Sequence, residues 1–256
     1  MRNLNKLCSL GDWQDRELLS EMTEIFKPRQ VFFHRKLWEW SIGLLAIKRA
    51  GKLNEQCIAL GIGCGAENPP FYLSNFMKYV FCTDLYTISS WNEANPQMLS
   101  NPGKIAPCAW NPRRMGVQVM DGTDIKFEDN SFDVVFSYSS IEHFGSREAI
   151  KKTMNEIERV LKPGGILSLA TEILISGDIN QLRINGPPIV HEIFTQEEVQ
   201  KYLIDSNRLK LTANIDYSQH NEPEIKFPEE ADKVPHIVLR YKGIKFGSLH
   251  LAMTKP

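Results

Sequence analysis

A glycine-rich turn between a buried strand and a helix is the feature that most constrains this chain. Residues 57–60 form a short apolar run typical of a fully buried strand, and Gly61, Gly63 and Gly65 follow it at alternate positions. Glycine permits a tight turn and lets a ligand approach the backbone, where a side chain would block both. A helix with proline in its first turn is expected from Glu67 onward. Strand, turn and helix form the first unit of a nucleotide-binding α/β sheet, although a purely structural turn would also use glycines.

Composition narrows the class of protein. The 256 residues, 42% hydrophobic and 24% charged, fit one large α/β domain or a core domain with an added cap. The net charge of −1 gives no general attraction to nucleic acid or to an anionic membrane, and we see no spanning segment and no signal peptide. The five cysteines are scattered and lack C-x-x-C spacing, which indicates reduced thiols in a cytoplasmic protein.

The N-terminal segment predicts two helices, over residues 12–26 and 30–50, with Asp12 as N-cap of the first. The second helix is rich in aromatic residues, and Arg35 and Lys36 lie among them. One interpretation is a helical layer packed against the sheet, because bulky aromatic residues dominate core burial. The other is a lid whose aromatic and basic residues close over a cofactor or substrate.

Acidic residues end two of the predicted strands. Asp84 ends the strand over residues 79–84, and it lies 21 positions after Gly63, where nucleotide-binding sheets place a carboxylate for ribose hydroxyls. Asp121 ends the strand over residues 117–121 and is followed by Gly122. A lone acid at a strand end is often only a turn-former, and Asp-Gly is itself a turn signal.

The next predicted strand covers residues 133–138, and Ser139 to Phe144 follow its carboxyl end, where open α/β sheets bind ligands. A helix then ends at Lys162-Pro163-Gly164-Gly165, and a further strand covers residues 166–171. Thr195 and Glu198 have the spacing of a capping box at the start of a later helix.

These segments together resemble a class I S-adenosylmethionine-dependent methyltransferase of the group that acts on small molecules and sugars. The resemblance covers roughly residues 55–171 and is carried by residues 60–65, Asp84, 120–122, 129–136, 140–143 and 159–165. The chain departs from the family at the glycine turn. The family usually has an acid where Gly61 stands, contacting the methionine amino group, and a glycine where Glu67 stands. Glu67 is a candidate to supply that carboxylate from the other side of the loop.

The resemblance implies an α/β, three-layer, Rossmann-like fold with an N-terminal helical cap. Its seven-stranded sheet would have the order 3-2-1-4-5-7-6, with strand seven antiparallel. Strands six and seven would cover residues 209–215 and 249–253. We expect a single methyltransferase domain, divided into an N-terminal helical lid, a cofactor-binding half, and a substrate-side half with a cap insertion: residues 1–52, 53–171, 172–256 and 217–247, respectively.

The resemblance also implies S-adenosylmethionine as cofactor and assigns residues to it. Asp84 would accept both ribose hydroxyls, Asp121 the adenine amino group, and the backbone of Gly122 and Thr123 would reach the adenine ring. The glycine turn would approach the methionine portion. The cofactor-binding candidates are Gly61, Gly63, Cys64, Gly65, Glu67, Asp84, Leu85, Asp121, Gly122, Thr123, Tyr138 and Ser139.

Methyl transfer asks little of side chains, because the sulfonium is an activated donor and in-line positioning supplies much of the rate. A hydroxyl acceptor also needs a base, and His143, at the end of the 133–138 strand, is the best-placed candidate. Glu172 and His191 are rivals, and a Glu-His pair at residues 142–143 is also common in the family as architecture. No ligand spacing supports a metal site.

The sequence therefore predicts a methyltransferase acting on a small-molecule acceptor, at a hydroxyl of a sugar or glycan precursor. We expect neither nucleic acid nor membrane as a partner, and the sequence leaves the oligomeric state open. A nicotinamide-dependent oxidoreductase shares the glycine turn, but no Tyr-x-x-x-Lys pair follows the 133–138 strand. A non-catalytic scaffold with the methyltransferase fold is the third alternative.

Overall fold

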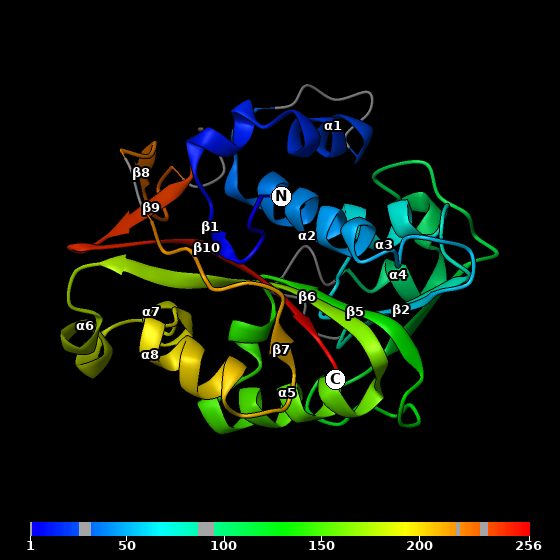
Figure 1. The fold of residues 1–256 in the computed structure, drawn as a ribbon. Coiled ribbons are helices and arrows are strands. Elements are labelled where there is room, and N and C mark those ends of the chain that lie inside the picture. The colour runs from blue at the N-terminus through cyan, green and yellow to red at the C-terminus, as the bar shows by residue number, and fades with distance from the viewer. Residues whose placement is uncertain (1, 26–31, 87–94, 219–220, 231–234) are drawn as a thin grey trace.

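The structure, a computed structural model, describes residues 2–25, 32–86, 95–218, 221–230 and 235–256. A central sheet lies between two layers of helices (Figure 1). The helices are α1 (Arg16–Ile25), α2 (Arg35–Arg49), α3 (Asn68–Leu73), α4 (Gln97–Ser100), α5 (Arg147–Val160), α6 (Ile179–Asn185), α7 (Ile189–Glu192) and α8 (Gln196–Glu198). Shorter turns are the 3₁₀ helices η1 (Leu10–Gln14), η2 (Pro102–Lys104) and η3 (Ile141–His143) and the π-helix η4 (Val199–Ile204). None of the helices in these ranges combines the length and hydropathy needed to cross a bilayer.

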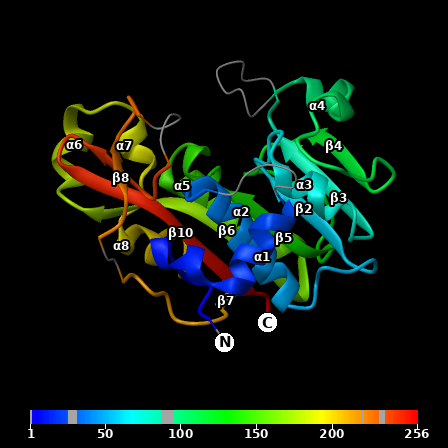
Figure 2. The same cartoon turned by 90° about the horizontal axis from the view of Figure 1, so that it is seen from above.

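The sheet has ten strands, and β4, β3, β2, β5 and β6 are parallel neighbours in that order. The strands are β1 (Lys6–Leu7), β2 (Ile58–Ile62), β3 (Tyr79–Asp84), β4 (Met115–Val119), β5 (Phe132–Tyr138), β6 (Leu161–Ser176), β7 (Lys210–Leu211), β8 (Glu224–Lys226), β9 (Val238–Tyr241) and β10 (Ile244–Thr254). Seen from above, β4 lies at one end of the molecule, and β8, α6 and α7 lie toward the other end (Figure 2).

The predicted seven-stranded sheet is wrong in the number of strands, and its order differs beyond β10, where β9 and β8 continue the sheet. The predicted sixth strand is present only as the short β7, which does pair with β10. From β4 to β10 the strands are neighbours in the predicted order, and β10 is antiparallel to β6 as predicted. The other edge of β10 is shared, because β9 pairs with its first residues while β1 and β7 pair with later ones. An 11-residue strand offers more backbone N–H and C=O groups than one short partner can satisfy, so several short strands divide that edge.

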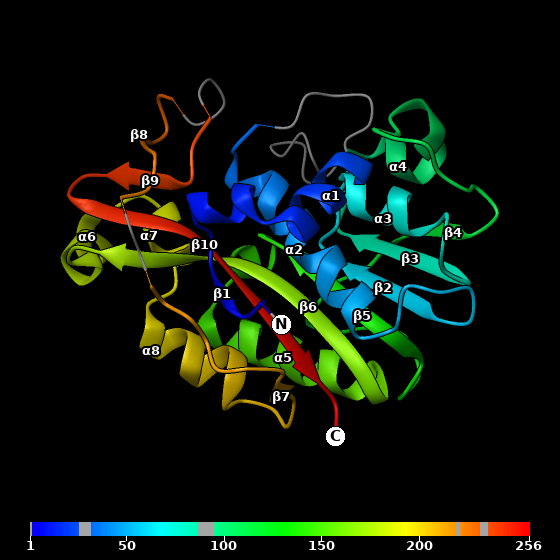
Figure 3. The same cartoon turned by 45° about the horizontal axis from the view of Figure 1, so that its top comes forward.

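Two helices with apolar faces cover the centre of the sheet. In α2, Trp38, Ile42 and Leu45 recur at helical spacing and are buried in the same cluster as residues of α1 and α3. In α5, Ile150 and Met154 belong to the cluster on the opposite side, together with residues of η4. Figure 3 shows α2 passing over the middle of the sheet, so its first turn can reach the strand ends.

A buried polar contact fixes α2 on the sheet. Ser168 Oγ donates to the Gly43 carbonyl at 3.2 Å, and it lies 3.1 Å from Tyr138 Oη and 3.0 Å from His250 Nε2. A side chain at Gly43 would overlap the Tyr138 ring, so glycine allows the helix to approach β5 and β6 this closely. The hydrogen bond at Gly43 therefore holds the middle of α2 on the sheet, in addition to the packing of its apolar face.

The N-terminal segment differs from the predicted pair of helices. Residues 10–14 form η1 and α1 begins only at Arg16, because Ser9 makes the capping box with Asp12. Asp12 is not an N-cap but a fully buried carboxylate that binds Lys6 and Trp38. Residues 26–31, which include the last residue of the first predicted helix and the first two residues of the second, lie outside the described part of the chain.

The predicted cap insertion, residues 217–247, contains β8 and β9 in its described part, and both strands extend the sheet. Residues 219–220 and 231–234 of this insertion lie outside the described ranges. The carbonyl of His236 accepts a hydrogen bond from the Arg35 N–H at 3.0 Å, so the insertion contacts the first residue of α2. Whether the segment caps a bound ligand stays a prediction.

Candidate active site

The glycine turn and Asp84 meet at the carboxyl ends of β2 and β3. Gly63 and Gly65 have φ values of +61° and +46°, which favour glycine. The Gly65 N–H donates to Asp84 Oδ2 at 3.0 Å, and Ser140 Oγ donates to the Gly63 carbonyl at 2.5 Å. A Cβ on Gly63 would lie 2.7 Å from the Ser140 Cβ, so the turn is held against the segment that follows β5. The result is a backbone cradle with a partly exposed carboxylate at its rim.

Gly61 is glycine for a reason of packing. A Cβ at this position would lie 2.5 Å from the Phe136 ring, which is buried on the neighbouring strand β5. An acidic side chain at residue 61 would therefore require Phe136 to move. This explains in physical terms why the acid usual in the resembled family is absent here.

The other predicted cofactor residues lie around the same strand ends. Asp121 is exposed, and its Oδ1 accepts the Thr123 N–H at 2.8 Å, so the predicted turn role is present. Gly122 packs against the Phe144 ring, and a Cβ added to Gly122 would lie 2.5 Å from a carbon of that ring. Leu85 is exposed, with its N–H donating to Asp84, whereas Cys64 is buried.

Two predicted residues at the end of β5 have different environments. The Tyr138 side chain is buried toward α2, and its carbonyl oxygen accepts a hydrogen bond from Lys36 Nζ at 2.9 Å. Ser139 has a φ of +50°, which turns the chain sharply after the strand. Glu67 pairs with Lys36 at 2.7 Å. The structure thus brings Glu67 and the end of β5 together through a lysine of α2.

The three predicted catalytic residues lie in or beside one cavity of about 380 Å³. Its lining comes from η3 and from the segment around α7, and consists of Glu142, His143, Gly145, Gly186, Pro188, His191 and Glu192. Glu192 Oε2 lies 3.1 Å from His143 Nδ1. Burial alone would lower the pKa of His143, but the contact with Glu192 and the Glu142 charge raise it above its ordinary value. His143 and His191 therefore share a polar cavity with two carboxyl groups.

Beneath this cavity lies a buried pair of carboxyl groups. Glu142 accepts hydrogen bonds from Thr171 Oγ1 at 2.9 Å and from the Glu172 N–H at 3.2 Å. Burial raises the pKa of Glu142 to about 7; His143 opposes this shift and Glu172 adds to it. Glu172, the second catalytic candidate, forms an ion pair with Arg35 at 2.6 Å. The Glu172 carboxylate thus pairs with α2, and Glu172 contacts the cavity lining only through its backbone N–H.

Sequence reasoning did not assign roles to Arg35, Lys36, Glu39 or Glu192. The signal for the first two was the pair of basic residues inside an aromatic helix, which led to the lid alternative. Nothing local indicates that α2 crosses the sheet and delivers this pair to the strand ends. Glu192 follows His191 in sequence, but only the turn of α7 brings its carboxylate to His143.

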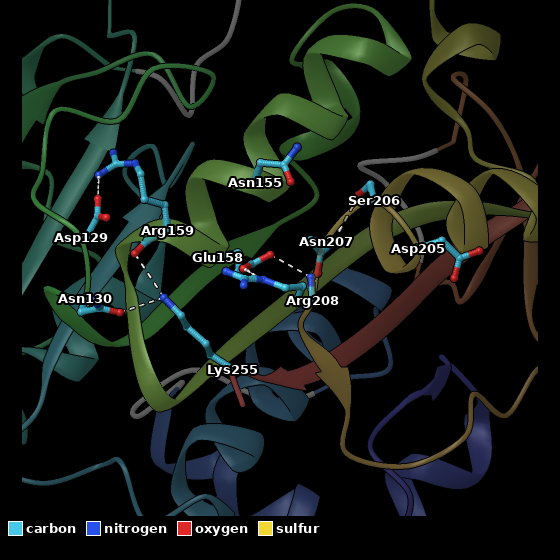
Figure 4. A pocket seen from close by; sticks show the side chains of 10 residues that line it. All are labelled: Asp129, Asn130, Asn155, Glu158, Arg159, Asp205, Ser206, Asn207, Arg208 and Lys255. Carbon is cyan, nitrogen blue, oxygen red and sulfur yellow. Dashed lines mark hydrogen bonds and ion pairs between the residues drawn. The ribbon is translucent and has the colours of Figure 1, made fainter.

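A larger groove, of about 720 Å³, lies at the amino ends of the parallel strands, opposite the candidate active site. Figure 4 shows its side chains paired with one another: Arg159 with Asp129 at 2.9 Å, and Arg208 with Glu158 at 2.6 Å. Lys255 Nζ donates to the Leu161 carbonyl at 2.7 Å. Ligands of open α/β sheets bind at the carboxyl ends of the strands, so we assign this groove a structural role. Among the residues described, no group of three His, Cys, Asp or Glu side chains is arranged to hold a metal ion.

Comparison with known proteins identifies a methyltransferase domain family model that matches residues 60–169. A sarcosine/dimethylglycine N-methyltransferase of Aphanothece halophytica is 32% identical over 109 residues, covering 41% of this chain and 34% of the relative. The 27-O-demethylrifamycin SV methyltransferase of Amycolatopsis mediterranei is 28% identical over 116 residues, covering 43% of this chain and 41% of the relative. The chain thus matches well under two thirds of the length of these relatives.

A solved structure shares the fold over most of the chain. The crystal structure of an S-adenosylmethionine-dependent methyltransferase from Aquifex aeolicus superposes with a TM-score of 0.51 at 17% identity. The superposition covers 92% of this chain and 98% of that chain. The superposed part of the chain is therefore much longer than the 60–169 segment.

Proposed function

Since the chain carries a class I S-adenosylmethionine-dependent methyltransferase domain, we propose that it methylates a hydroxyl group of a small neutral molecule, a sugar or glycan precursor. The observation that carries the proposal is that the glycine cradle is joined directly to the His143 cavity. Ser140 donates to the Gly63 carbonyl, and the Phe144 ring packs against Gly63 and Gly122. The segment 140–144, which contains His143, therefore contacts both the glycine turn and the loop at Gly122.

The residues present fit this cofactor. Gly63 and Gly65 adopt the positive φ values that shape the backbone cradle, and Asp84 presents a partly exposed carboxylate suited to vicinal hydroxyls. When bound, S-adenosylmethionine supplies a methyl group activated by the positive sulfonium, so positioning of the acceptor provides much of the rate. The part of the protein is to hold the two reactants in line and to remove the proton from the acceptor.

His143 is the residue that we assign to proton removal. Glu192 beside Nδ1 favours the tautomer with its proton on that nitrogen, which places the basic lone pair on Nε2. A neutral imidazole is suited to accept a hydroxyl proton as the bond between the acceptor oxygen and the methyl carbon forms. The same contact fixes the orientation of the ring, as a carboxylate does for histidine in other general-base pairs.

The charges around the cavity favour a neutral acceptor over an anionic one. Glu142 and Glu192 line it, and Glu172 lies directly behind, next to the Glu142 carboxylate. An acceptor that carries phosphate or carboxylate would meet Glu192 at short range in a partly dry site, where like-charge repulsion is large. Glu142, with a pKa of about 7, adds a partial negative charge near neutral pH, whereas Glu172 is paired with Arg35. One relative is named for methylation of 27-O-demethylrifamycin SV, which supports an oxygen as the acceptor atom.

The proposal is tested in two steps. Calorimetry should detect binding of S-adenosylmethionine and no binding of NAD(H), the ligand of the alternative oxidoreductase reading. Transfer of a radiolabelled methyl group is then measured on a panel of neutral sugars, phosphorylated sugars and small amines. Label on a neutral sugar is the expected result. Binding of NAD(H) alone would overturn the proposal, cofactor binding without any transfer would favour a scaffold, and label on an amine alone would overturn the hydroxyl assignment.

Asp84→Ala is expected to weaken cofactor binding by about 2 kcal/mol, or roughly 30-fold, because charge-assisted hydrogen bonds to the ribose are lost. Asp121→Ala should cost less, since it would contact one neutral adenine amino group. Calorimetry with S-adenosylhomocysteine measures both losses, and circular dichroism checks the fold. Wild-type affinity in a folded Asp84→Ala protein would remove this residue from the site.

A further inference from the structure

The direction of the chain connections reverses between the neighbouring strands β2 and β5. Helix α3 follows β2 on one face of the sheet and α5 follows β5 on the other (Figure 1). In open α/β sheets such a switch point is where a ligand enters, outside the carboxyl ends of the two strands. The glycine turn and Glu67 follow β2 at this point, and Tyr138 is the last residue of β5.

Lys36 of α2 contacts both Glu67 and the end of β5. Its Nζ lies 2.7 Å from Glu67 Oε1, 2.9 Å from the Tyr138 carbonyl oxygen and 3.4 Å from Glu39 Oε2. Glu67 also accepts a hydrogen bond from Trp40 Nε1 at 3.0 Å. The Lys36 and Glu67 side chains are 23% and 10% exposed, so both are mostly buried but still reach solvent.

The packing of Gly61 excludes a carboxylate at the first position of the glycine turn. No carboxylate can stand on residue 61 without displacing the Phe136 ring. Glu67, at the N-cap of α3 and six residues further on, is the carboxylate that borders the same turn. Burial raises the pKa of Glu67 even though Lys36 opposes the shift, so a second cation beside it would be electrostatically favourable.

We propose that Lys36 and Glu67 form the subsite for the amino-acid end of the cofactor, with Lys36 pairing with its carboxylate and Glu67 with its ammonium group. This inference rests on the proposed function. A zwitterion matches a lysine–glutamate pair in charge, and each protein group would gain an opposite charge while keeping its present partner. Glu39 and the Tyr138 carbonyl would continue to hold Lys36 in place.

The test compares two ligands that differ only at this end of the cofactor. S-adenosylhomocysteine carries the amino-acid end, and 5′-methylthioadenosine lacks it. Calorimetry should show that Lys36→Met weakens S-adenosylhomocysteine binding by roughly 10- to 100-fold, the scale of a charged hydrogen bond, and changes methylthioadenosine binding by less than about threefold. Glu67→Gln should give the same selective loss, and it keeps Lys36 paired with Glu39 should Lys36→Met fail to fold.

Lys162→Met is the matched control. Lys162 Nζ pairs with Asp133 at 2.8 Å at the opposite end of β5, so its loss should leave both affinities unchanged. A folded Lys36 or Glu67 variant that binds both ligands equally more weakly, or that keeps the wild-type affinity for S-adenosylhomocysteine, would overturn this inference. The proposed function would still stand. A wild-type protein that binds neither ligand overturns the proposed function, and this inference with it, so the two failures are distinguishable.

Discussion

Replacement of His143 by glutamine is expected to lower the turnover number by roughly two to four orders of magnitude, the usual range for loss of a general base. Glutamine keeps a polar side chain of similar length in the cavity but cannot accept the proton at neutral pH. Cofactor affinity should barely change, because no cofactor contact is assigned to this side chain. The measurement is single-turnover transfer of a labelled methyl group, with calorimetry on the same protein preparation.

The pH profile separates proton removal from architecture. His143 must be deprotonated to act, and its pKa lies above the ordinary value of 6.5, so activity should rise as pH increases through that raised pKa. Glu192→Gln removes one of the groups that raise the pKa, so the rising limb should move to lower pH. In His143→Gln the limb should disappear.

His191→Gln is the control within the same cavity, and activity should stay within a few-fold of wild type. A large loss there, together with an active His143→Gln protein that keeps the pH limb, would transfer the role to His191. The same test with Glu172→Gln examines the third candidate, which the structure places in an ion pair with Arg35.

Much of the parallel part of the sheet could be predicted, because its strands are apolar runs that end at polar or glycine residues. The strand over residues 79–84 has the predicted bounds, and the capping box of Thr195 and Glu198 is confirmed. The edge of β10 could not be predicted. Strands such as β1 and β7 contain two residues each, and so short a segment has no periodicity that indicates which backbone it pairs with.

The candidate site also has one part that could be predicted from the sequence and one part that could not. Asp84 and the glycine turn are found from sequence because one βαβ unit fixes their separation. The contacts of Lys36 and Arg35 depend on how α2 lies across the sheet, which is set by packing at Gly43 and Ser168. Glu142 was seen only as part of a family motif, and its hydrogen bonds to the neighbouring strand β6 require the three-dimensional structure.

Removal of the buried Asp12 carboxylate is expected to have the largest effect on stability. Asp12 accepts hydrogen bonds from Lys6 Nζ at 2.7 Å, Trp38 Nε1 at 2.6 Å and the Ser9 N–H at 3.1 Å, and it also pairs with Arg2. Asp12→Ala would leave a mostly buried lysine ammonium without this partner and an indole N–H without an acceptor. Such losses cost about 3–5 kcal/mol, a large share of the 5–15 kcal/mol typical of a folded domain. Urea denaturation followed by circular dichroism measures the change in the free energy of unfolding.

Asp124→Ala is the matched surface control, because Asp124 also pairs with a lysine, Lys126, but both side chains are more than half exposed. Exposed pairs contribute about 0–1 kcal/mol, so the two aspartates should differ by several-fold in their effect. Because Trp38 lies on α2, loss of Asp12 also loosens the helix that carries Lys36. Cofactor affinity should therefore fall together with stability in Asp12→Ala, and should stay unchanged in Asp124→Ala. Equal stability losses in the two variants would show that burial of Asp12 does not determine its contribution, and would contradict the role assigned to it in fixing α2.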